Sequence, residues 1–350
     1  MKAAGPDAKV RVALVGCGYW GPKVIRAAAS LPDVEVAALV DFREDLREAL
    51  RGHYPLARST ATLGEALAGG PLDAVIVATN PATHIEVASE AIEGGCHVMV
   101  EKPLALSAAD CRALGVKARD AGLVLMAGHT FRFSPLVNHV QSLIESGELG
   151  EIYSIDSQRL NLGRVRKDVD AIWNFAPHDI SILNYWLGQH PRAVHCHAYD
   201  YLQPGIPDLA FLVLEYERTV AHVHISWLHP SKVRRATIVG SKKMVVYDDV
   251  EGQIVVHDAG IDRERVDRTF PDFETFGEFR LIQRVGDMHI PRVPLAEPLA
   301  LQCRHFVDCI RAGTEPVTDF EDAARVVEVL EAASASHTNG GARVVIPDLP

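Results

Sequence analysis

The sequence predicts two domains, an α/β domain followed by an α+β domain, and three observations support this division. Strand and helix signals alternate over the first 130 residues, whereas short alternating runs typical of antiparallel strands begin at about residue 150. A chain of 350 residues is also long for a single hydrophobic core. We therefore expect a first domain over residues 1–130 and a second over residues 131–350.

The predicted strands of the first domain are apolar throughout, as in a parallel sheet that helices cover on both faces. They lie at 10–15, 34–40, 73–79, 96–100 and 123–127. Helical patterns lie between them at 43–51, 62–68, 83–93 and 107–121. In such a sheet, the ligand binds at the carboxyl ends of the strands.

The first strand runs directly into a Gly-x-Gly-x-x-Gly turn. Gly16 permits the tight turn, Gly18 lets the backbone approach a pyrophosphate, and Gly21 lets the helix pack closely on the strand. The free N–H groups at the helix N-terminus favour the phosphates. The pattern predicts a Rossmann domain that binds a dinucleotide through this turn, which also contains Tyr19 and Trp20.

Asp41 ends the second strand, 20 residues after Gly21. A carboxylate there accepts hydrogen bonds from the adenosine ribose and repels a 2′-phosphate, so the sequence predicts NAD as the cofactor. Arg43 lies beside this acid, and NADP is the less favoured alternative.

Two polar segments follow apolar strands of the same sheet, Thr79-Asn80-Pro81 and Glu101-Lys102-Pro103. We expect both at the cofactor site. Pro103 holds Lys102 in an extended conformation. The lysine could then hydrogen-bond the reacting oxygen and help to move its proton. The alternative is a surface lysine in a strand-to-helix loop.

The second domain is predicted to be an open, mainly antiparallel sheet. Its strands lie at 151–160, 192–199, 209–216, 219–228, 234–240, 243–248 and 253–257. Helices are expected at about 177–187, 298–312 and 320–337. The segment 258–297 is rich in charge and proline and is predicted to be irregular.

Pro177 is expected at the first position of the helix over 177–187. His178 would then lie in the first turn, where the positive end of the helix dipole disfavours the imidazolium. A neutral imidazole can serve as the general base when a sugar-type hydroxyl is oxidised. The alternative is a histidine in a capping turn.

Composition restricts the class of protein. With 48% hydrophobic and 23% charged residues, the chain is an ordinary globular protein. A formal net charge of −11 argues against nucleic acid or an anionic membrane as a main partner. No apolar run reaches the length of a membrane span, and the first residues lack the hydrophobic stretch of a signal peptide. We therefore expect a cytoplasmic protein.

The cysteines and histidines do not predict a metal site. The six cysteines are scattered without a Cys-x-x-Cys pair, as is usual in a reduced compartment. His195 and His197, like His222 and His224, would share one face of a strand. Such pairs also occur on half-solvated strands, and no third ligand lies at a recognisable spacing.

These features together resemble the Gfo/Idh/MocA family (glucose–fructose oxidoreductase, inositol dehydrogenase and rhizopine catabolism) of NAD(P)-dependent oxidoreductases. The resemblance covers nearly the whole chain, and its most specific motif is His97-Val98-Met99-Val100-Glu101-Lys102-Pro103-Leu104. The other matching segments are 15–21, 78–84, 128–135, 177–180 and 297–299, followed by 305–306.

The resemblance implies a function and a set of site residues. Thr79, Asn80, His84 and Glu101 would contact the cofactor, and Lys102, often across a cis Lys-Pro bond, would orient the substrate. His178 would exchange the substrate's proton, and hydride would pass between a ring carbon and the nicotinamide. Asn161, Arg164 and Asp179 are the expected substrate contacts. The substrate class is a sugar, nucleotide sugar, glycoside or cyclitol, and a homodimer or homotetramer is expected through the second domain's sheet.

One position departs from the family pattern. Many members carry an aspartate four residues before the histidine, where this chain has Asn174. An amide can orient an imidazole but cannot stabilise its cation by charge. Either another acid such as Asp179 supplies the charge, or the proton path is altered, or catalysis has been lost. Two alternative functions therefore remain: transient use of NAD for net hydrolysis or epimerisation, and a non-catalytic dinucleotide-binding regulator.

Overall fold

The computed structural model describes residues 8–163, 165–265 and 279–347, which form two compact units. The first unit contains Met1–Ser134 and Ala296–Glu331, and the second contains Pro135–Leu295 and Ala332–Pro350. The predicted boundary at residue 130 lies close to Ser134. The predicted division into 1–130 and 131–350 assigned residues 296–331 to the second domain, whereas Ala296–Glu331 belongs to the first unit.

Parallel strands form the sheet of the first unit, in the order β3-β2-β1-β4-β5-β6. The Rossmann fold predicted for this part of the chain is confirmed. The strands are β1 (Val10–Val15), β2 (Val34–Val40), β3 (Arg58–Thr60), β4 (Ala74–Val77), β5 (His97–Glu101) and β6 (Leu125–Gly128). The short edge strand β3 is the one that the sequence analysis missed.

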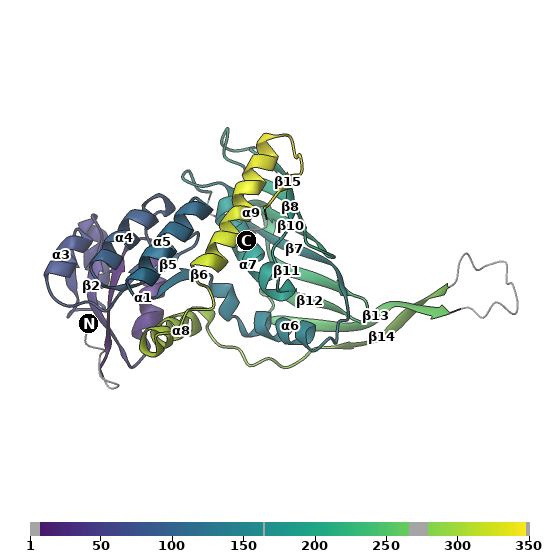
Figure 1. Ribbon diagram of the computed structural model, residues 1–350, viewed down its shortest axis with the longest axis horizontal. Helices are drawn as coiled ribbons and strands as arrows, with labels where there is room; N and C mark the ends of the chain where they lie inside the picture. Colours follow the sequence, from purple (N-terminus) through teal and green to yellow (C-terminus); the bar gives the residue numbers. More distant parts are fainter. Residues whose placement is uncertain (1–7, 164, 266–278, 348–350) are drawn as a thin grey trace, which may run out of the picture. The chain divides into compact units, whose positions relative to one another are not determined.

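Helices cover both faces of this sheet (Figure 1). They are α1 (Gly21–Ala29), α2 (Glu44–Arg51), α3 (Leu63–Ala68), α4 (His84–Glu93), α5 (Ala108–Asp120) and α8 (Pro298–Ala312). One core cluster joins alternate residues of the strands, such as Leu14, Ile76 and Met99, to the buried faces of α1 and α8. Because α8 supplies Phe306 to this cluster, a segment from late in the sequence completes the first unit.

The second unit is built on a mainly antiparallel sheet in the order β14-β13-β12-β11-β7-β10-β9-β8-β15. Its strands are β7 (Ile152–Leu162), β8 (Ala193–Tyr199), β9 (Leu209–Glu215), β10 (Val220–Ser226), β11 (Leu228–Gly240), β12 (Met244–Asp248), β13 (Gln253–Arg265), β14 (Phe279–His289) and β15 (Val344–Val345). The pair β7 and β10 is parallel, and the other neighbours are antiparallel.

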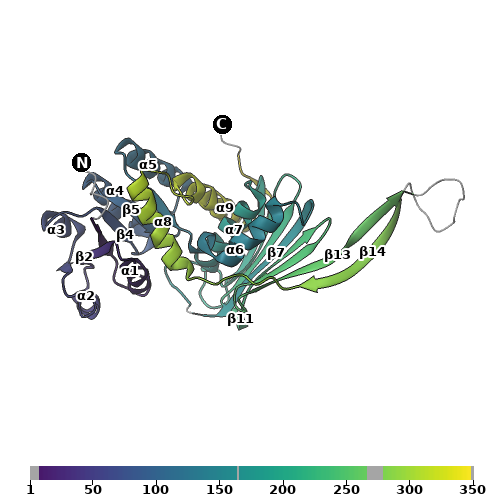
Figure 2. The ribbon, with the colours of Figure 1, turned by 90° about the horizontal axis from the view of Figure 1, so that it is seen from below.

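Helices α6 (Pro135–Glu145) and α7 (Ala171–Leu187) pack against this sheet (Figure 2). Ile180 and Leu183 of α7 are buried. Trp186 of α7 meets Tyr247 of β12 edge to face, with ring centroids 5.6 Å apart. Helix α9 (Phe320–Thr338) begins in the first unit and ends in the second.

The prediction that 258–297 is irregular was wrong for much of its length. Strands β13 and β14 pair as a long hairpin that extends beyond the other strands of the sheet (Figures 1 and 2). Several of its apolar side chains, including Ile261, Leu281 and Val285, are exposed. Ile254 and Val256 near the start of β13 are buried, but the exposed apolar residues farther along the hairpin do not produce the alternation of buried apolar and exposed polar residues that predicts a strand.

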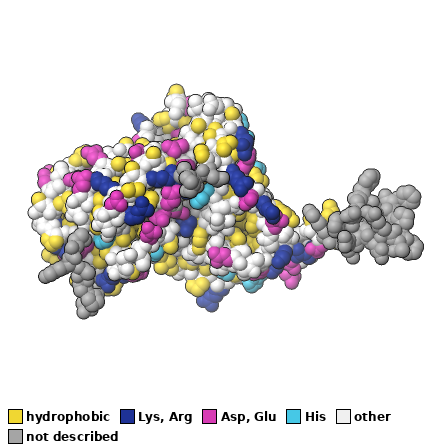
Figure 3. All heavy atoms as spheres, viewed as in Figure 1, with side chains coloured by type: hydrophobic (Ala, Val, Ile, Leu, Met, Phe, Trp, Pro, Cys, Tyr) yellow, Lys and Arg dark blue, Asp and Glu magenta, His cyan; other side chains and the backbone are white. Residues whose placement is uncertain are grey.

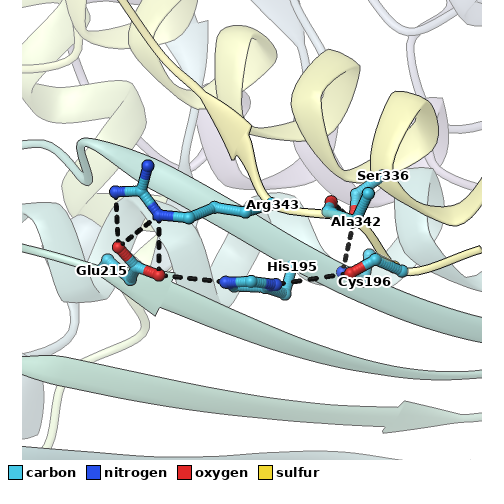
Figure 4. Close-up of polar contacts among 7 residues, drawn as sticks. His195, Cys196, Glu215, Ser336, Ala342 and Arg343 are labelled. Atoms are coloured by element: carbon cyan, nitrogen blue, oxygen red, sulfur yellow. Dashed lines mark hydrogen bonds and ion pairs between the residues drawn. The ribbon is translucent and has the colours of Figure 1, made fainter. Parts of the chain in front are cut away.

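The last described strand closes the other edge of the sheet. β15 pairs with β8, and Arg343, just before it, forms a bidentate ion pair with Glu215 of β9 (Figure 4). Glu215 also faces His195 of β8, with 3.0 Å between Oε1 and Nε2. Ser336 accepts the N–H of Cys196 and donates to the Ala342 carbonyl, which fixes the end of α9 to the same edge (Figure 4).

The surface carries charges of both signs. Acidic and basic side chains are intermixed on the face shown in Figure 3. Among the described residues, no helix is both long enough and apolar enough to cross a membrane.

Candidate active site

The predicted cofactor residues follow the carboxyl ends of adjacent parallel strands. The glycine turn follows β1, Asp41 follows β2, Thr79 and Asn80 follow β4, and Lys102 follows β5. Because β2, β1, β4 and β5 are neighbours in the sheet, these segments share one edge of the first unit. This is the edge at which doubly wound sheets bind their ligands.

The three glycines of the turn have different surroundings. Gly16 has a φ of 97°, and a Cβ there would lie 2.6 Å from the Ala78 carbonyl oxygen. A Cβ at Gly21 would lie 2.0 Å from the Gly16 carbonyl oxygen. A Cβ at Gly18 would meet no atom within 4 Å. The protein's own packing therefore requires Gly16 and Gly21, whereas the space beside Gly18 is open to a pyrophosphate.

The two aromatic residues of the turn differ in exposure. Tyr19 is 71% exposed, and the Lys23 ammonium lies 3.6 Å from the centroid of its ring. Trp20 packs against the core cluster at the start of α1. Tyr19 is therefore accessible to a ligand, and Trp20 supports the turn from within.

Asp41 connects the end of β2 to the glycine turn. Its Oδ2 accepts the Cys17 N–H at 2.8 Å, and its Oδ1 accepts the Arg43 N–H at 2.9 Å. The Arg43 guanidinium pairs instead with Asp45, with 2.6 Å between Nη2 and Oδ2. The carboxylate is therefore fixed beside the turn, and the nearby cation is directed to another acid.

His84 connects two of the loops at this edge. Its Nδ1 lies 2.8 Å from the Pro103 carbonyl oxygen, and its Nε2 lies 3.3 Å from the Thr79 carbonyl oxygen. Burial is the largest effect on His84 and lowers its pKa. His84 holds the loops after β4 and β5 together and is itself buried. Asn80 accepts the Ala82 N–H and caps the turn before α4.

The Glu101-Lys102-Pro103 segment follows the buried strand β5. The Lys102–Pro103 peptide bond is cis. Glu101 is buried, and burial raises its pKa to about 7. A Cβ at Gly128 of β6 would lie 3.1 Å from Glu101, so the glycine allows the two strand ends to pack together. Lys102 is half-buried.

The predicted start of the helix that carries His178 was wrong. Asp170 caps α7 by accepting the Trp173 N–H at 2.8 Å, and the helix begins at Ala171 with Pro177 in its interior. His178 therefore lies seven residues beyond the first helical residue, and the dipole argument for a neutral imidazole no longer applies. Because α7 begins at Ala171, it contains both Asn174 and His178, which are four residues apart in the sequence. Their side chains therefore share one face of the helix.

Asp179 points away from this face. Its Oδ2 lies 2.6 Å from Arg159 Nε, and its Oδ1 accepts the Ser157 hydroxyl at 2.8 Å. All three side chains are buried in the second unit. Asp179 therefore has a buried cation as its partner. The structure supports neither the prediction that Asp179 contacts the substrate nor the prediction that it supplies the charge beside His178.

The remaining predicted substrate residues lie near the end of β7. Asn161 is half-buried and shares a strand face with Ser157 and Arg159, since residues two apart on a strand point to the same side. Arg164 lies outside the described residues. Within the described parts of the chain, no three His, Cys, Asp or Glu side chains are grouped as metal ligands would be.

One residue at the cofactor edge was missed. His129 directly follows β6 and is buried, with neither ring nitrogen hydrogen-bonded within the described residues. In the sequence, His129 belongs to the segment 128–135, one of those that match the family. Its position after the fifth apolar strand was the available signal.

Comparisons with known proteins agree with this fold. A model described as the oxidoreductase family with an NAD-binding Rossmann fold matches residues 10–129. A second, described as the GFO/IDH/MocA C-terminal domain, matches residues 137–246. Both parts of the chain therefore match the same family.

Named relatives extend these matches. A 4-carboxy-2-hydroxymuconate-6-semialdehyde dehydrogenase of Sphingobium sp. is 32% identical over 192 residues, a match that covers 53% of this chain and 61% of the relative. The chain thus spans less than two thirds of that relative's length. The scyllo-inositol 2-dehydrogenase (NAD(+)) of Bacillus subtilis is 24% identical, with 95% of each chain covered. Among solved structures, GenD2 from gentamicin A biosynthesis in complex with NAD gives a TM-score of 0.81 at 24% identity, with 99% of each chain covered.

Proposed function

The chain belongs to the Gfo/Idh/MocA family of oxidoreductases, and we propose that it is an NAD-dependent dehydrogenase. It would transfer hydride between the nicotinamide and a secondary ring alcohol, or the matching ketone. The substrate would be a sugar, nucleotide sugar, glycoside or cyclitol. The similarity to a scyllo-inositol dehydrogenase along nearly the whole chain supports a polyhydroxylated ring as the substrate class.

One observation carries this proposal: Lys102 follows β5 at the edge where the glycine turn and Asp41 follow β1 and β2. The open space beside Gly18 suits a pyrophosphate, and the fixed Asp41 carboxylate suits an unphosphorylated adenosine ribose. When NAD is bound, the chemistry that it supplies is hydride transfer. The proposed role of the Lys102 ammonium at this edge is to act on the reacting oxygen.

The chain's own residues divide the remaining work. Lys102 would hydrogen-bond the substrate oxygen and stabilise the charge that develops on it. His178 would take the hydroxyl proton, with Asn174 one helical turn away to orient the ring. Asn161 and Arg164 would hold other hydroxyls of the substrate. We assign Asp179 to the support of Arg159 and not to substrate binding.

We also propose a homodimer or homotetramer formed through the sheet of the second unit. Exposed apolar residues on its strands and hairpin, among them Phe211, Ile261 and Val285, support such an interface. All six cysteines are buried free thiols, which supports a reducing compartment such as the cytoplasm.

The test is to incubate the protein with NAD and a panel of sugars, glycosides and cyclitols and to follow absorbance of the reduced nicotinamide. The proposal expects accumulation of NADH with at least one ring alcohol. Conversion of a substrate without NADH accumulation would indicate transient use of the cofactor. Binding of NAD without conversion of any panel member would favour the non-catalytic regulator, which Lys102 and His178 argue against and Asn174 leaves open.

A further inference from the structure

Lys23 places a positive charge against the turn at which a Rossmann domain holds the pyrophosphate of its cofactor. Its ammonium lies 3.6 Å from the centroid of the Tyr19 ring and 5.2 Å from that of the Trp20 ring. These two aromatic residues directly follow Gly18, beside which the space is open. A helical side chain leans toward the N-terminus of its helix, so a lysine in the first turn of α1 reaches back to the glycine turn.

No acid of the described residues neutralises this charge. The Lys23 ammonium has no carboxylate partner there, in contrast to Lys117, which pairs with Glu93. The first turn of α1 contains no acidic residue, and no side chain caps its N-terminus. The face of an aromatic ring attracts an ammonium without using its N–H donors as a carboxylate would. The Tyr19 ring can therefore hold the ammonium in place while it binds an anion.

A pyrophosphate at this turn would meet charges of both signs. It carries two negative charges, and the Asp41 carboxylate beside the turn carries a third. The two arginines that contact Asp41 already have partners. The Arg43 guanidinium pairs with Asp45, and the Arg47 guanidinium donates to the Asp41 carbonyl oxygen. The helix N-terminus supplies only partial positive charge, so the ammonium on the turn itself adds what the turn otherwise lacks.

We propose that Lys23 binds the pyrophosphate of NAD through its ammonium and that the Tyr19 ring holds the ammonium in position. Lys23 is then a cofactor-binding residue outside the Gly-x-Gly-x-x-Gly pattern, and Tyr19 is a positioning residue. The inference rests on NAD binding by the first unit. It is independent of the substrate class and of hydride transfer, because its test measures binding and not turnover.

The test measures dissociation constants of NAD and ADP-ribose by calorimetry at several salt concentrations. ADP-ribose has the same pyrophosphate but lacks the nicotinamide. Lys23→Met keeps much of the length of the side chain and removes the charge, and we expect it to weaken both ligands by the same factor, about tenfold at low salt. Because salt screens charges, the affinity of the wild type should fall as salt rises, and the fall should be smaller in Lys23→Met.

Lys23→Arg and Lys117→Met are the matched controls. Lys23→Arg restores the positive charge and should restore most of the affinity. Lys117→Met removes a lysine of an exposed ion pair on α5 and should leave both dissociation constants and their salt dependence unchanged. Wild-type affinity in Lys23→Met would overturn the proposal, and so would a loss of affinity with unchanged salt dependence, which would assign the lysine a structural role. If Lys23→Met fails to fold, a wild-type affinity that does not change with salt would contradict the proposal directly.

The positioning role of Tyr19 has a test of its own. Tyr19→Leu removes the ring, and it should weaken NAD less in the Lys23→Met protein than in the wild type, since the ring acts through the ammonium. Tyr19→Phe keeps the aromatic face and should bind NAD as the wild type does. Additive losses in the double variant would overturn this role. Failure of the wild type to bind NAD would contradict the NAD-dependent function as well, which separates the failure of that proposal from the failure of this one.

Discussion

Arg159 and Asp179 form a buried ion pair in the second unit, with 2.6 Å between Nε and Oδ2 and side chains that are 6% and 5% exposed. The pair joins β7 to α7, the helix that carries His178, and the Ser157 hydroxyl donates to the same carboxylate. The acid next to the candidate base is thus committed to holding its helix against the sheet.

Removal of this acid should destabilise the fold strongly. Asp179→Ala leaves the buried Arg159 guanidinium without the Asp179 carboxylate, and the loss of one member of a buried ion pair typically costs about 3–5 kcal/mol. Asp156→Ala is the matched control, because Asp156 lies on β7 with Arg159 and forms an exposed pair with His222. This substitution should lower the free energy of unfolding by about 0–1 kcal/mol. Urea unfolding of the two variants measures the difference. Similar small losses would show that the buried pair does not stabilise the helix.

Asp41 should determine the preference for NAD. A carboxylate that faces a 2′-phosphate brings two like charges together and disfavours NADP. Asp41→Ala should therefore reduce the ratio of NAD affinity to NADP affinity, chiefly by weakening the binding of NAD. Titrations of NAD and NADP measure both affinities, with Glu44→Ala as the exposed control on α2. Equal affinity of the wild type for the two cofactors, or undiminished discrimination in Asp41→Ala, would remove Asp41 from this role.

Glu101 should make the stability of the cofactor-free protein depend on pH. Burial raises its pKa to about 7 in the folded protein, above the ordinary glutamate value of 4.5. The folded state therefore holds a proton that the unfolded state releases, and this stabilisation is complete below pH 4.5 and lost as the pH rises through about 7. Glu101→Gln should reduce the fall in Tm between pH 5 and about pH 8, relative to wild type and to the exposed control Glu93→Gln. An unchanged fall would indicate that Glu101 ionises normally.

The pair Asn174 and His178 should respond to an added charge. If His178 is the general base, oxidation rises with pH as the imidazole loses its proton. Asn174→Asp places a carboxylate one helical turn away, which favours the imidazolium and should move the kinetic pKa upward by up to about one or two units. The measurement is the pH profile of kcat/KM for wild type, Asn174→Asp and His178→Ala. An active His178→Ala enzyme with an unchanged profile would exclude His178 as the base.

The parts of the fold that the sequence predicted are those with a strong local pattern. The apolar strands of the first unit, the glycine turn and Asp41 each depend on neighbours in the sequence, so composition and spacing were sufficient to place them. The long hairpin of β13 and β14 was missed because several of its apolar residues, such as Leu281 and Val285, are exposed and give no alternating pattern.

The errors at the candidate site have similar physical origins. Pro177 predicts a helix start because proline is common at that position, but the Asp170 cap begins the helix more than a turn earlier. The Arg159–Asp179 pair joins residues 20 apart in the sequence and becomes visible only in the folded sheet. Burial of His129 likewise depends on tertiary packing, which no local pattern reports.

The central claim is net transfer of hydride from a ring carbon to NAD with Lys102 at the reacting oxygen. The most direct measurement uses a ring alcohol identified in the panel, deuterated at the reacting carbon, and follows the label in the reduced cofactor for wild type and Lys102→Ala. The account predicts one equivalent of deuterated NADH for each oxidised substrate in wild type. In Lys102→Ala the rate should fall about 10²–10⁴-fold, and the affinity for NAD should stay nearly intact. The control Lys117→Ala removes a lysine of an exposed ion pair on α5 and should behave as wild type. Retention of the label in the ring product, or a near-normal rate in Lys102→Ala, would contradict the account.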